Sequence, residues 1–273
     1  MQLTQILNGA EQIVQEAGSL VKRMRDEGRV KVSIKKDGSP TTNADEDGEQ
    51  YIKRGLNKLT PEYSFLGEET GDEVGTDGHE WLCDPIDGTR SFINGNNNYT
   101  TTVALRNGSK TLGGVIFNPE TRECYKSCDG QEPTKNSERM PKTAITNLKE
   151  ATVNYSISTK RADAKNALER AVAEGNIGVA ARTNGSVAYR LAQVAEGKDA
   201  QAYVSYQTSP LNSWDIAAGV HLIESNGGKV TGGDGKPFAE SRYKDLLIAA
   251  ANQEIHRQLL AYLQQRIMQS VTA

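Results

Sequence analysis

The stretch WLCDPIDGTRSF (residues 81–92) places two aspartates, Asp84 and Asp87, three positions apart at the end of a short apolar segment. Residues three apart on a regular strand point to opposite faces of the sheet. Pro85 cannot donate to a sheet ladder, so we predict that the strand ends there and the chain bends. The bend would direct both carboxylates into one pocket. The alternative is an ordinary capped turn, with Asp87 as a helix N-cap and Asp84 as a surface acid.

Gly88 and Thr89 follow directly, and we predict that they open a short helical turn. The backbone N–H groups and the positive dipole end of such a turn suit a phosphate. The stretch therefore indicates a carboxylate site beside a phosphate site.

Three other acidic segments change the balance between these alternatives. Glu68 in FLGEET follows a predicted strand, and Asp215 in SWDIAAG and Asp45 in SPTTNAD stand at predicted helix starts. Each alone is unremarkable, because Glu68 fits a solvated loop and the aspartates fit helix caps. All of them, however, lie at junctions between strands and helices, where they can converge.

Converging carboxylates cannot all stay ionised unless cations neutralise them. Oxygen ligands without His or Cys nearby favour Mg²⁺, which is commonly completed by substrate phosphate oxygens. The pattern therefore predicts metal-assisted hydrolysis of a phosphate ester.

The composition of the 273-residue chain excludes several other classes of protein. The net charge of -3 gives no reason to expect binding to nucleic-acid polymers or membrane surfaces, and no apolar run is long enough for a transmembrane helix. Three scattered cysteines favour reduced thiols in a cytoplasmic protein over a disulfide scaffold. The three histidines show no metal-ligand spacing, and no G-x-S-x-G motif is present.

The periodicity of apolar residues predicts an α+β first half and an α/β second half. Helices are expected at 3–24, 44–59, 163–173, 186–196, 214–224 and 255–267. Strands are expected at 29–34, 64–66, 81–83, 100–106, 111–117, 123–127, 151–157, 177–181, 201–205, 229–231 and 246–250, with an exposed loop at 71–80. The polar segment 129–142 carries two prolines and is the expected linker. We therefore predict an N-terminal subdomain 1–142 with most metal ligands and a C-terminal subdomain 143–273 that supplies Asp215.

The strings GEE (67–69), DPIDGT (84–89) and WDIAAG (214–219) together resemble the inositol monophosphatase family. This family belongs to the lithium-sensitive, Mg²⁺-dependent phosphatase superfamily, which includes phosphatases of 3′-phosphoadenosine 5′-phosphate. Supporting strings are SPTTNAD (39–45), GSVAYRLAQVAEGKDAQAY (185–203) and ESNGGKV (224–230). The resemblance implies a five-layer αβαβα sandwich of the inositol monophosphatase and fructose-1,6-bisphosphatase type. It also implies a homodimer and two to three Mg²⁺ ions per active site.

The resemblance also implies roles for individual residues. Glu68, Asp84 and the carbonyl of Ile86 would bind a first metal, and Asp84, Asp87 and Asp215 a second. Glu68 would also face a third, weakly held ion. The N–H groups of Gly88 and Thr89 would hold phosphate, while Asp45 and the Thr89 hydroxyl would orient and deprotonate the attacking water. Gly185 and Ser186 open a predicted helix and are candidates for substrate contact, or else an ordinary helix cap.

Two departures from the family pattern leave the substrate open. The region 126–141 is shortened and altered, and no acid occurs between Asp199 and Asp215, where inositol enzymes place one for substrate hydroxyls. The Ser-Pro-x-x-x-Trp-Asp pattern (209–215) and SISTKRADAK (156–165) resemble the nucleotide branch instead. An inositol-monophosphate-like ester is the main prediction and a 3′(2′),5′-bisphosphate nucleotidase the alternative. NADP, histidinol phosphate and fructose-1,6-bisphosphate are further options, and a regulatory binding protein that retains the fold is the alternative of another class.

Overall fold

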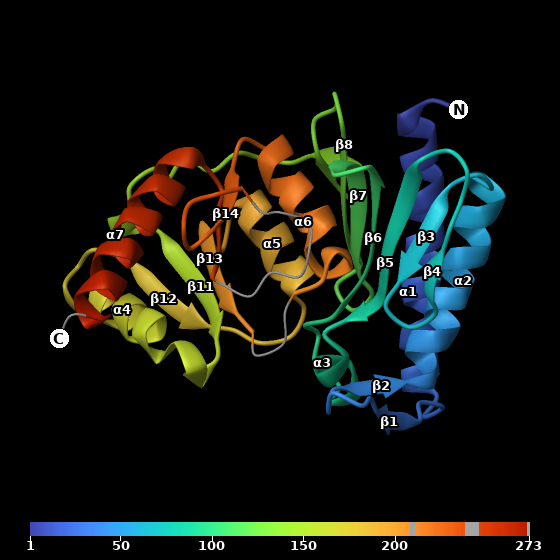
Figure 1. Cartoon of the computed structure of the whole chain (residues 1–273), viewed down its shortest axis with the longest axis horizontal. Coiled ribbons are helices and arrows are strands. Elements are labelled where there is room, and N and C mark those ends of the chain that lie inside the picture. The colour runs from blue at the N-terminus through green and yellow to red at the C-terminus, as the bar shows by residue number, and fades with distance from the viewer. Residues whose placement is uncertain (208–210, 238–245, 272–273) are drawn as a thin grey trace. The chain divides into compact units, whose positions relative to one another are not determined.

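The computed structural model describes residues 1–207, 211–237 and 246–271, and the chain forms two compact units (Figure 1). Unit 1 contains Met1–Arg139, Gly185–Tyr189 and Ser213–Leu222. Unit 2 contains Met140–Asn184, Arg190–Asn212 and Ile223–Ala273. The first division lies close to the expected boundary at 142, whereas the segment with Asp215 packs with unit 1 although it is distant in sequence.

Unit 1 is built on an eight-stranded sheet, in which β3 and β5 are parallel and the other neighbours antiparallel. In spatial order its strands are β10 (Glu138–Arg139), β9 (Thr134–Lys135), β8 (Glu123–Cys128), β7 (Lys110–Asn118), β6 (Thr100–Asn107), β5 (His79–Asp87), β3 (Ser64–Gly67) and β4 (Gly71–Glu73). A separate antiparallel ribbon consists of β1 (Val32–Ile34) and β2 (Pro40–Thr42).

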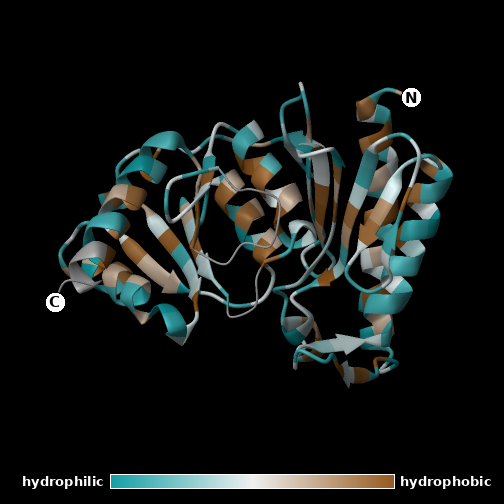
Figure 2. Cartoon of the chain, in the orientation of Figure 1, coloured by the Kyte–Doolittle hydropathy of each residue, from teal (hydrophilic) through white to brown (hydrophobic). Residues whose placement is uncertain are grey.

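Helices cover both faces of this sheet. On one face, α1 (Leu3–Asp26) and α2 (Asn43–Leu59) share an apolar core with the strands, and the outward side of α2 is largely hydrophilic (Figure 2). Adjacent glycines on β7 demonstrate the two-sided packing. A Cβ on Gly113 would come within 2.4 Å of Leu7 in α1, and a Cβ on Gly114 within 2.8 Å of Ala218 in α6 (Ser213–Ser225).

Unit 2 is a second layered element, with a five-stranded sheet among its described residues. Its strands, in spatial order, are β12 (Val179–Arg182), β11 (Thr152–Ile157), β13 (Ala202–Tyr206), β15 (Leu247–Ala250) and β14 (Lys229–Gly232). The first three are parallel, and β15 is antiparallel to both of its neighbours. The apolar sides of α4 (Ala162–Ala173) and α7 (Gln253–Val271) pack on one face and form its core.

Short helical elements complete the chain. They are α3 (Thr89–Ile93), the 3₁₀ helices η1 (Leu148–Glu150) and η2 (Thr159–Arg161), and α5 (Val187–Glu196), whose first residues belong to unit 1. None of the described helices is long and apolar enough to span a membrane. The predicted helices and most predicted strands are confirmed, and the architecture is a layered α+β fold.

The prediction that the strand ends at Pro85 is wrong. Strand β5 continues to Asp87, but its pairing with β6 shifts register: Asp84 lies opposite Thr102, and Asp87 opposite Thr100. Two residues of β5 therefore face one of β6, which is a β-bulge, and a bulge re-aims the side chains beside it. The predicted loop 71–80 is also partly wrong, because it contains β4 and the first residues of β5.

Candidate active site

Carboxylates from three separate elements of unit 1 converge at one end of its sheet. Glu68 follows β3, Asp84 lies at the bulge of β5, and Asp215 lies in the first turn of α6. One carboxylate oxygen from each lies within 4.8 Å of the others, close enough to share a metal ion. Asp45 and Asp87 lie outside this group of three. The structure thus brings Asp215 beside two acids, Glu68 and Asp84, from which it is separated by more than a hundred residues in sequence.

The electrostatics of this group favour a bound cation. Burial, followed by the charges of Glu68, Asp87 and Asp215, raises the pKa of Asp84 well above its usual range. Burial also raises the pKa of Glu68, although Lys35 opposes the shift. Buried like charges are unfavourable unless protons or cations neutralise them. An all-oxygen donor set in this state fits a hard divalent metal ion.

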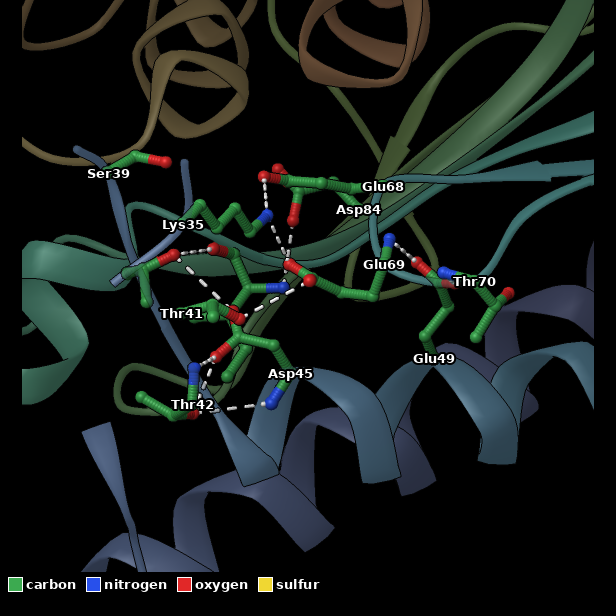
Figure 3. A network of polar contacts seen from close by, with 12 residues as sticks. Lys35, Ser39, Thr41, Thr42, Asp45, Glu49, Glu68, Glu69, Thr70 and Asp84 are labelled. Atoms are coloured by element: carbon green, nitrogen blue, oxygen red, sulfur yellow. Dashed lines mark hydrogen bonds and ion pairs between the residues drawn. The ribbon is translucent and has the colours of Figure 1, made fainter. Parts of the chain in front are cut away.

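Lys35 provides part of that neutralisation, and the sequence did not identify it. Its Nζ donates to Glu68 Oε1 at 2.7 Å and to Glu69 Oε1 at 2.6 Å, and Figure 3 shows its side chain reaching toward both carboxylates. Burial lowers the pKa of Lys35, but the two glutamates more than compensate and raise it above its ordinary value. Thr41 also donates to Glu69, at 3.3 Å. These partners lie far apart in sequence, so no local pattern could have paired them.

The second aspartate of the DPIDGT segment has different partners. Asp87 Oδ2 accepts from the Ser186 hydroxyl at 2.5 Å and from the backbone N–H of Ala188 at 2.7 Å. Burial raises the pKa of Asp87 to about 7, although these hydrogen bonds oppose the shift. Ser186 is itself buried, contacts Thr100 Oγ1 at 2.8 Å and accepts from Tyr189 N at 2.8 Å. The segment predicted for substrate contact therefore positions an expected metal ligand.

Asp45 and Thr89 lie together beside the bulge. The Thr89 hydroxyl is 3.4 Å from Asp45 Oδ1 and 3.2 Å from the carbonyl oxygen of Ile86. Asp45 Oδ2 accepts from the N–H and hydroxyl of Thr42 at 2.8 and 2.5 Å. Burial raises the pKa of Asp45 to about 7, with Glu69 and Glu68 adding to the shift and the Thr42 bonds opposing it. Thr42 was missed, although its T-x-x-D spacing is typical of a capping box.

Two glycines, Gly88 and Gly185, allow the backbone segments that carry Thr89 and Ser186 to approach each other closely. Gly88 has φ = +93°, a region that favours glycine. A Cβ there would lie 2.8 Å from the Asn98 carbonyl oxygen and from Ser186 N. Gly185 has φ = +91°, and a Cβ there would lie 2.3 Å from the same Asn98 carbonyl oxygen. The predicted phosphate segment and the predicted substrate segment therefore adjoin each other within unit 1.

Glu49 of α2 stabilises the turn that carries Glu68, and the sequence did not identify this residue either. The buried Glu49 carboxylate accepts from Glu69 N at 2.9 Å and from Thr70 N at 2.6 Å (Figure 3). Gly67 makes room for it, since a Cβ there would lie 2.4 Å from this carboxylate. The one available signal was the i, i+4 spacing of Asp45 and Glu49, which places both on the same side of a helix.

Comparison with known proteins places this chain in a family of phosphatases. The chain matches the inositol monophosphatase family over residues 2–269 and belongs to that family. It is 32% identical over 268 residues to the inositol-1-monophosphatase of Rhizobium meliloti (strain 1021), a match that covers 96% of this chain and 97% of the relative. It is 30% identical over 231 residues to the 3′(2′),5′-bisphosphate nucleotidase CysQ of Escherichia coli (strain K12), covering 83% of this chain and 90% of the relative.

Solved structures show the same fold. The extragenic suppressor protein suhB from Bartonella henselae superposes with a TM-score of 0.82 at 26% identity, over 96% of this chain and 99% of the other. An inositol monophosphatase from Thermotoga maritima gives a TM-score of 0.82 at 24% identity, over 97% and 98% of the two chains. The predicted family and fold type are therefore confirmed.

Proposed function

We propose that the chain is a Mg²⁺-dependent phosphomonoesterase that hydrolyses a small, anionic phosphate ester resembling inositol monophosphate. The observation that carries this proposal is the convergence of Glu68, Asp84 and Asp215, two of which have raised pKa values. Such buried, mutually repelling acids are costly to a protein with no cation to place there. A regulatory protein that used only its surface would gain nothing from them.

The family resemblance implies how the metals would be held. Glu68, Asp84 and the Ile86 carbonyl would bind one Mg²⁺ ion, and Asp84, Asp87 and Asp215 a second, with Glu68 facing a third. Bound Mg²⁺ supplies a Lewis acid and lowers the pKa of water, which makes hydroxide available near neutral pH. Lithium sensitivity is expected with this ligand set, as the family resemblance implies.

We assign activation of the water and binding of the phosphate to residues beside the metal ligands. Asp45 and the Thr89 hydroxyl orient the attacking water, and the Asp45 carboxylate accepts its proton. The backbone N–H groups of Gly88 and Thr89 hold the phosphate. Thr42 fixes Asp45 through two hydrogen bonds, so the base is oriented before the substrate arrives.

A bisphosphate nucleotidase is the second candidate, and two segments that resemble the nucleotide branch favour it. They are SISTKRADAK (156–165) and the Ser-Pro-x-x-x-Trp-Asp pattern (209–215). Unit 2 itself has a pocket of about 480 Å³ at the carboxyl ends of the parallel strands β11, β12 and β13. Its polar lining consists of Ser156, Ser158, Arg182, Thr183, Asn184 and Gln207. Ser209 and Pro210 of the nucleotidase-like pattern lie outside the described residues.

The proposal also covers the cellular location and the oligomeric state of the protein. All three cysteines are free and buried, which suits a reducing compartment, and we propose a cytoplasmic protein. We also propose a homodimer, as the family resemblance implies. Light scattering on the purified chain tests the dimer, and a monomeric mass at micromolar concentration would contradict it.

Phosphate release from a substrate panel tests the activity. The panel contains inositol 1-phosphate, 3′-phosphoadenosine 5′-phosphate, NADP, histidinol phosphate and fructose-1,6-bisphosphate. We expect Mg²⁺-dependent turnover of at least one ester, with inhibition by Li⁺. Preference for inositol 1-phosphate supports the main proposal, and preference for 3′-phosphoadenosine 5′-phosphate the second. No turnover with any ester would refute both.

The substitution Asp215→Asn tests the metal assignment. We expect the Mg²⁺ concentration for half-maximal rate to rise by about tenfold or more, because one charged ligand is lost. Asp72→Asn is the matched control, since Asp72 is an exposed acid of β4 in the same unit. An unchanged rate and Mg²⁺ dependence in Asp215→Asn would show that the assignment is wrong.

A further inference from the structure

A histidine on α6 connects this helix to the sheet of unit 1, two turns away from Asp215. His221 Nδ1 lies 2.8 Å from the Ser127 hydroxyl of β8, and Nε2 lies 3.2 Å from Asp129 Oδ1 just beyond β8. Lys110 of β7 donates to the other oxygen of Asp129 at 2.5 Å. A neutral imidazole satisfies both contacts, accepting from the Ser127 hydroxyl and donating to the Asp129 carboxylate.

The side of α6 that carries His221 also packs closely on the sheet. Ala218 lies one turn before His221, and a Cβ on Gly114 would come within 2.8 Å of it. Gly114 is paired with Ser127 across β7 and β8. Close apolar packing at Ala218 and polar contacts at His221 therefore fix α6 at two successive turns over the same pair of strands.

The position of α6 on the sheet determines where Asp215 lies. Glu68 and Asp84 come from strands of the sheet, whereas Asp215 comes from the first turn of α6. A helix rises 1.5 Å per residue, so a slide of a single residue is large compared with the tolerance of a metal site. Close packing of Ala218 on Gly114 resists such a slide, and a histidine bonded through both ring nitrogens adds contacts of defined direction.

We propose that His221 is a positioning residue for the metal site. Its hydrogen bonds to Ser127 and Asp129 hold α6 in place on β8 and thereby hold Asp215 beside Glu68 and Asp84. The proposal rests on the proposed function in taking these acids as metal ligands. This histidine has no metal-ligand spacing in the sequence, and its role is to support a ligand at a distance.

The same three residues invite comparison with a serine hydrolase triad, and the burial of Ser127 excludes that interpretation. Ser127 is 1% exposed, so a substrate carbonyl cannot reach its oxygen. A nucleophile must be accessible to its substrate as well as bonded to a base. A role in holding α6 against the sheet agrees with both the burial and the hydrogen bonds.

The experiment compares Mg²⁺ binding by calorimetry in the full-length wild type, His221→Ala and His221→Gln. We expect about tenfold weaker Mg²⁺ binding in His221→Ala, the loss typical of an outer supporting partner of a metal ligand. In His221→Gln, which can restore one hydrogen bond, we expect a smaller loss. At saturating Mg²⁺, kcat of His221→Ala should return to within about threefold of wild type, because no group that contacts substrate has changed.

His79→Ala is the matched control. His79 contacts Asp77 and Asn107 in the same unit, but at the opposite end of β5 from the bulge. Unchanged Mg²⁺ affinity in folded His221→Ala, or an equal loss in His79→Ala, would overturn the proposal. If His221→Ala does not fold, Ser127→Ala removes one of the two contacts without altering α6 and should weaken Mg²⁺ binding in the same direction.

The outcomes also separate this proposal from the proposed function. If wild type binds Mg²⁺ but hydrolyses no phosphate ester, the function fails while the affinity comparison still decides the role of His221. If wild type binds no Mg²⁺, both are overturned.

Discussion

Asp84 and Asp87 stand three residues apart on one buried strand, yet their carboxylates are held in different ways. Asp87 accepts hydrogen bonds from Ser186 and Ala188, which belong to a distant segment. Asp84 accepts from Ile86 N in its own turn, at 2.9 Å, and faces Glu68 and Asp215. Burial raises the pKa of Asp84 well above normal and that of Asp87 to about 7.

The difference between Asp84 and Asp87 shows two ways in which a protein can accommodate a buried acid. Asp87 is oriented by donors that the chain supplies, so its position is set before any ion binds. Asp84 is surrounded by like charges, so its ionised form depends on a cation. Substitutions at the two places should therefore affect stability in opposite directions, even though both weaken activity.

The largest effect is expected for Asp84→Asn. Loss of a carboxylate proposed to contact two metals should lower kcat/KM by about 10³-fold or more, which corresponds to about 4 kcal/mol in the transition state. The metal-free variant should melt a few degrees higher than wild type near pH 7, because a neutral amide replaces an acid that folding must otherwise keep protonated or bury as a charge.

Phosphate release in Mg²⁺ and thermal melting in EDTA measure these two quantities. The exposed acid variant Asp72→Asn should change neither. A metal-free Asp84→Asn protein that melts lower than wild type would contradict the view that Asp84 is an uncompensated charge.

A smaller effect of the opposite sign on stability is expected for Ser186→Ala. It removes one donor from Asp87 and the acceptor of Tyr189 N at the start of α5. We expect Mg²⁺ affinity to fall about tenfold and the free energy of unfolding to fall by about 1–2 kcal/mol. Metal titration and denaturant unfolding measure the two changes.

Ser158→Ala is the matched control, since Ser158 caps η2 by accepting from Lys160 N at 3.2 Å. It should lose some stability and keep wild-type Mg²⁺ affinity. Equal Mg²⁺ affinities in Ser186→Ala and Ser158→Ala would remove the distinction between Asp87 and an ordinary buried acid.

The contrast between these aspartates also shows how far the sequence could lead. The strings around Glu68, Asp84 and Asp215 were sufficient to predict that their carboxylates converge, because each string lies at the end of a regular element. Helices were predicted well, since the apolar period of segments such as α1 extends over several turns. The end of β5 was predicted wrongly because the rule for proline did not anticipate a bulge.

Supporting contacts between distant segments were beyond prediction. Lys35 follows β1, and it reaches Glu68 and Glu69 only because the β1–β2 ribbon lies beside the turn that follows β3. His221 and Ser127 are brought together by packing of α6 on β8 and not by any local pattern. A single sequence specifies which residue types recur at element ends, whereas the partner of each side chain depends on how the elements pack.

The smallest effect, and the most direct probe of the buried acids, is the pH dependence of metal-free stability. Burial raises the pKa of Asp45 and Asp87 to about 7, and the pKa of Asp84 lies well above normal. In the unfolded chain an aspartate titrates near 3.9. Between about pH 4 and 7 the folded chain binds more protons than the unfolded chain, so stability must fall as pH rises through that range.

Melting temperatures in EDTA should therefore drop by about 5 °C between pH 5 and pH 8, and saturating Mg²⁺ should remove most of that drop by binding the ionised form. His256 contributes with the opposite sign: burial lowers its pKa, so its penalty is relieved as pH rises toward 6.5. Because His256 belongs to unit 2 and not to the acid group, its contribution is the same in EDTA and in Mg²⁺ and cancels in their difference. Asp84→Asn should flatten the EDTA curve, and parallel curves in EDTA and Mg²⁺ for wild type would show that the acids carry no such linkage.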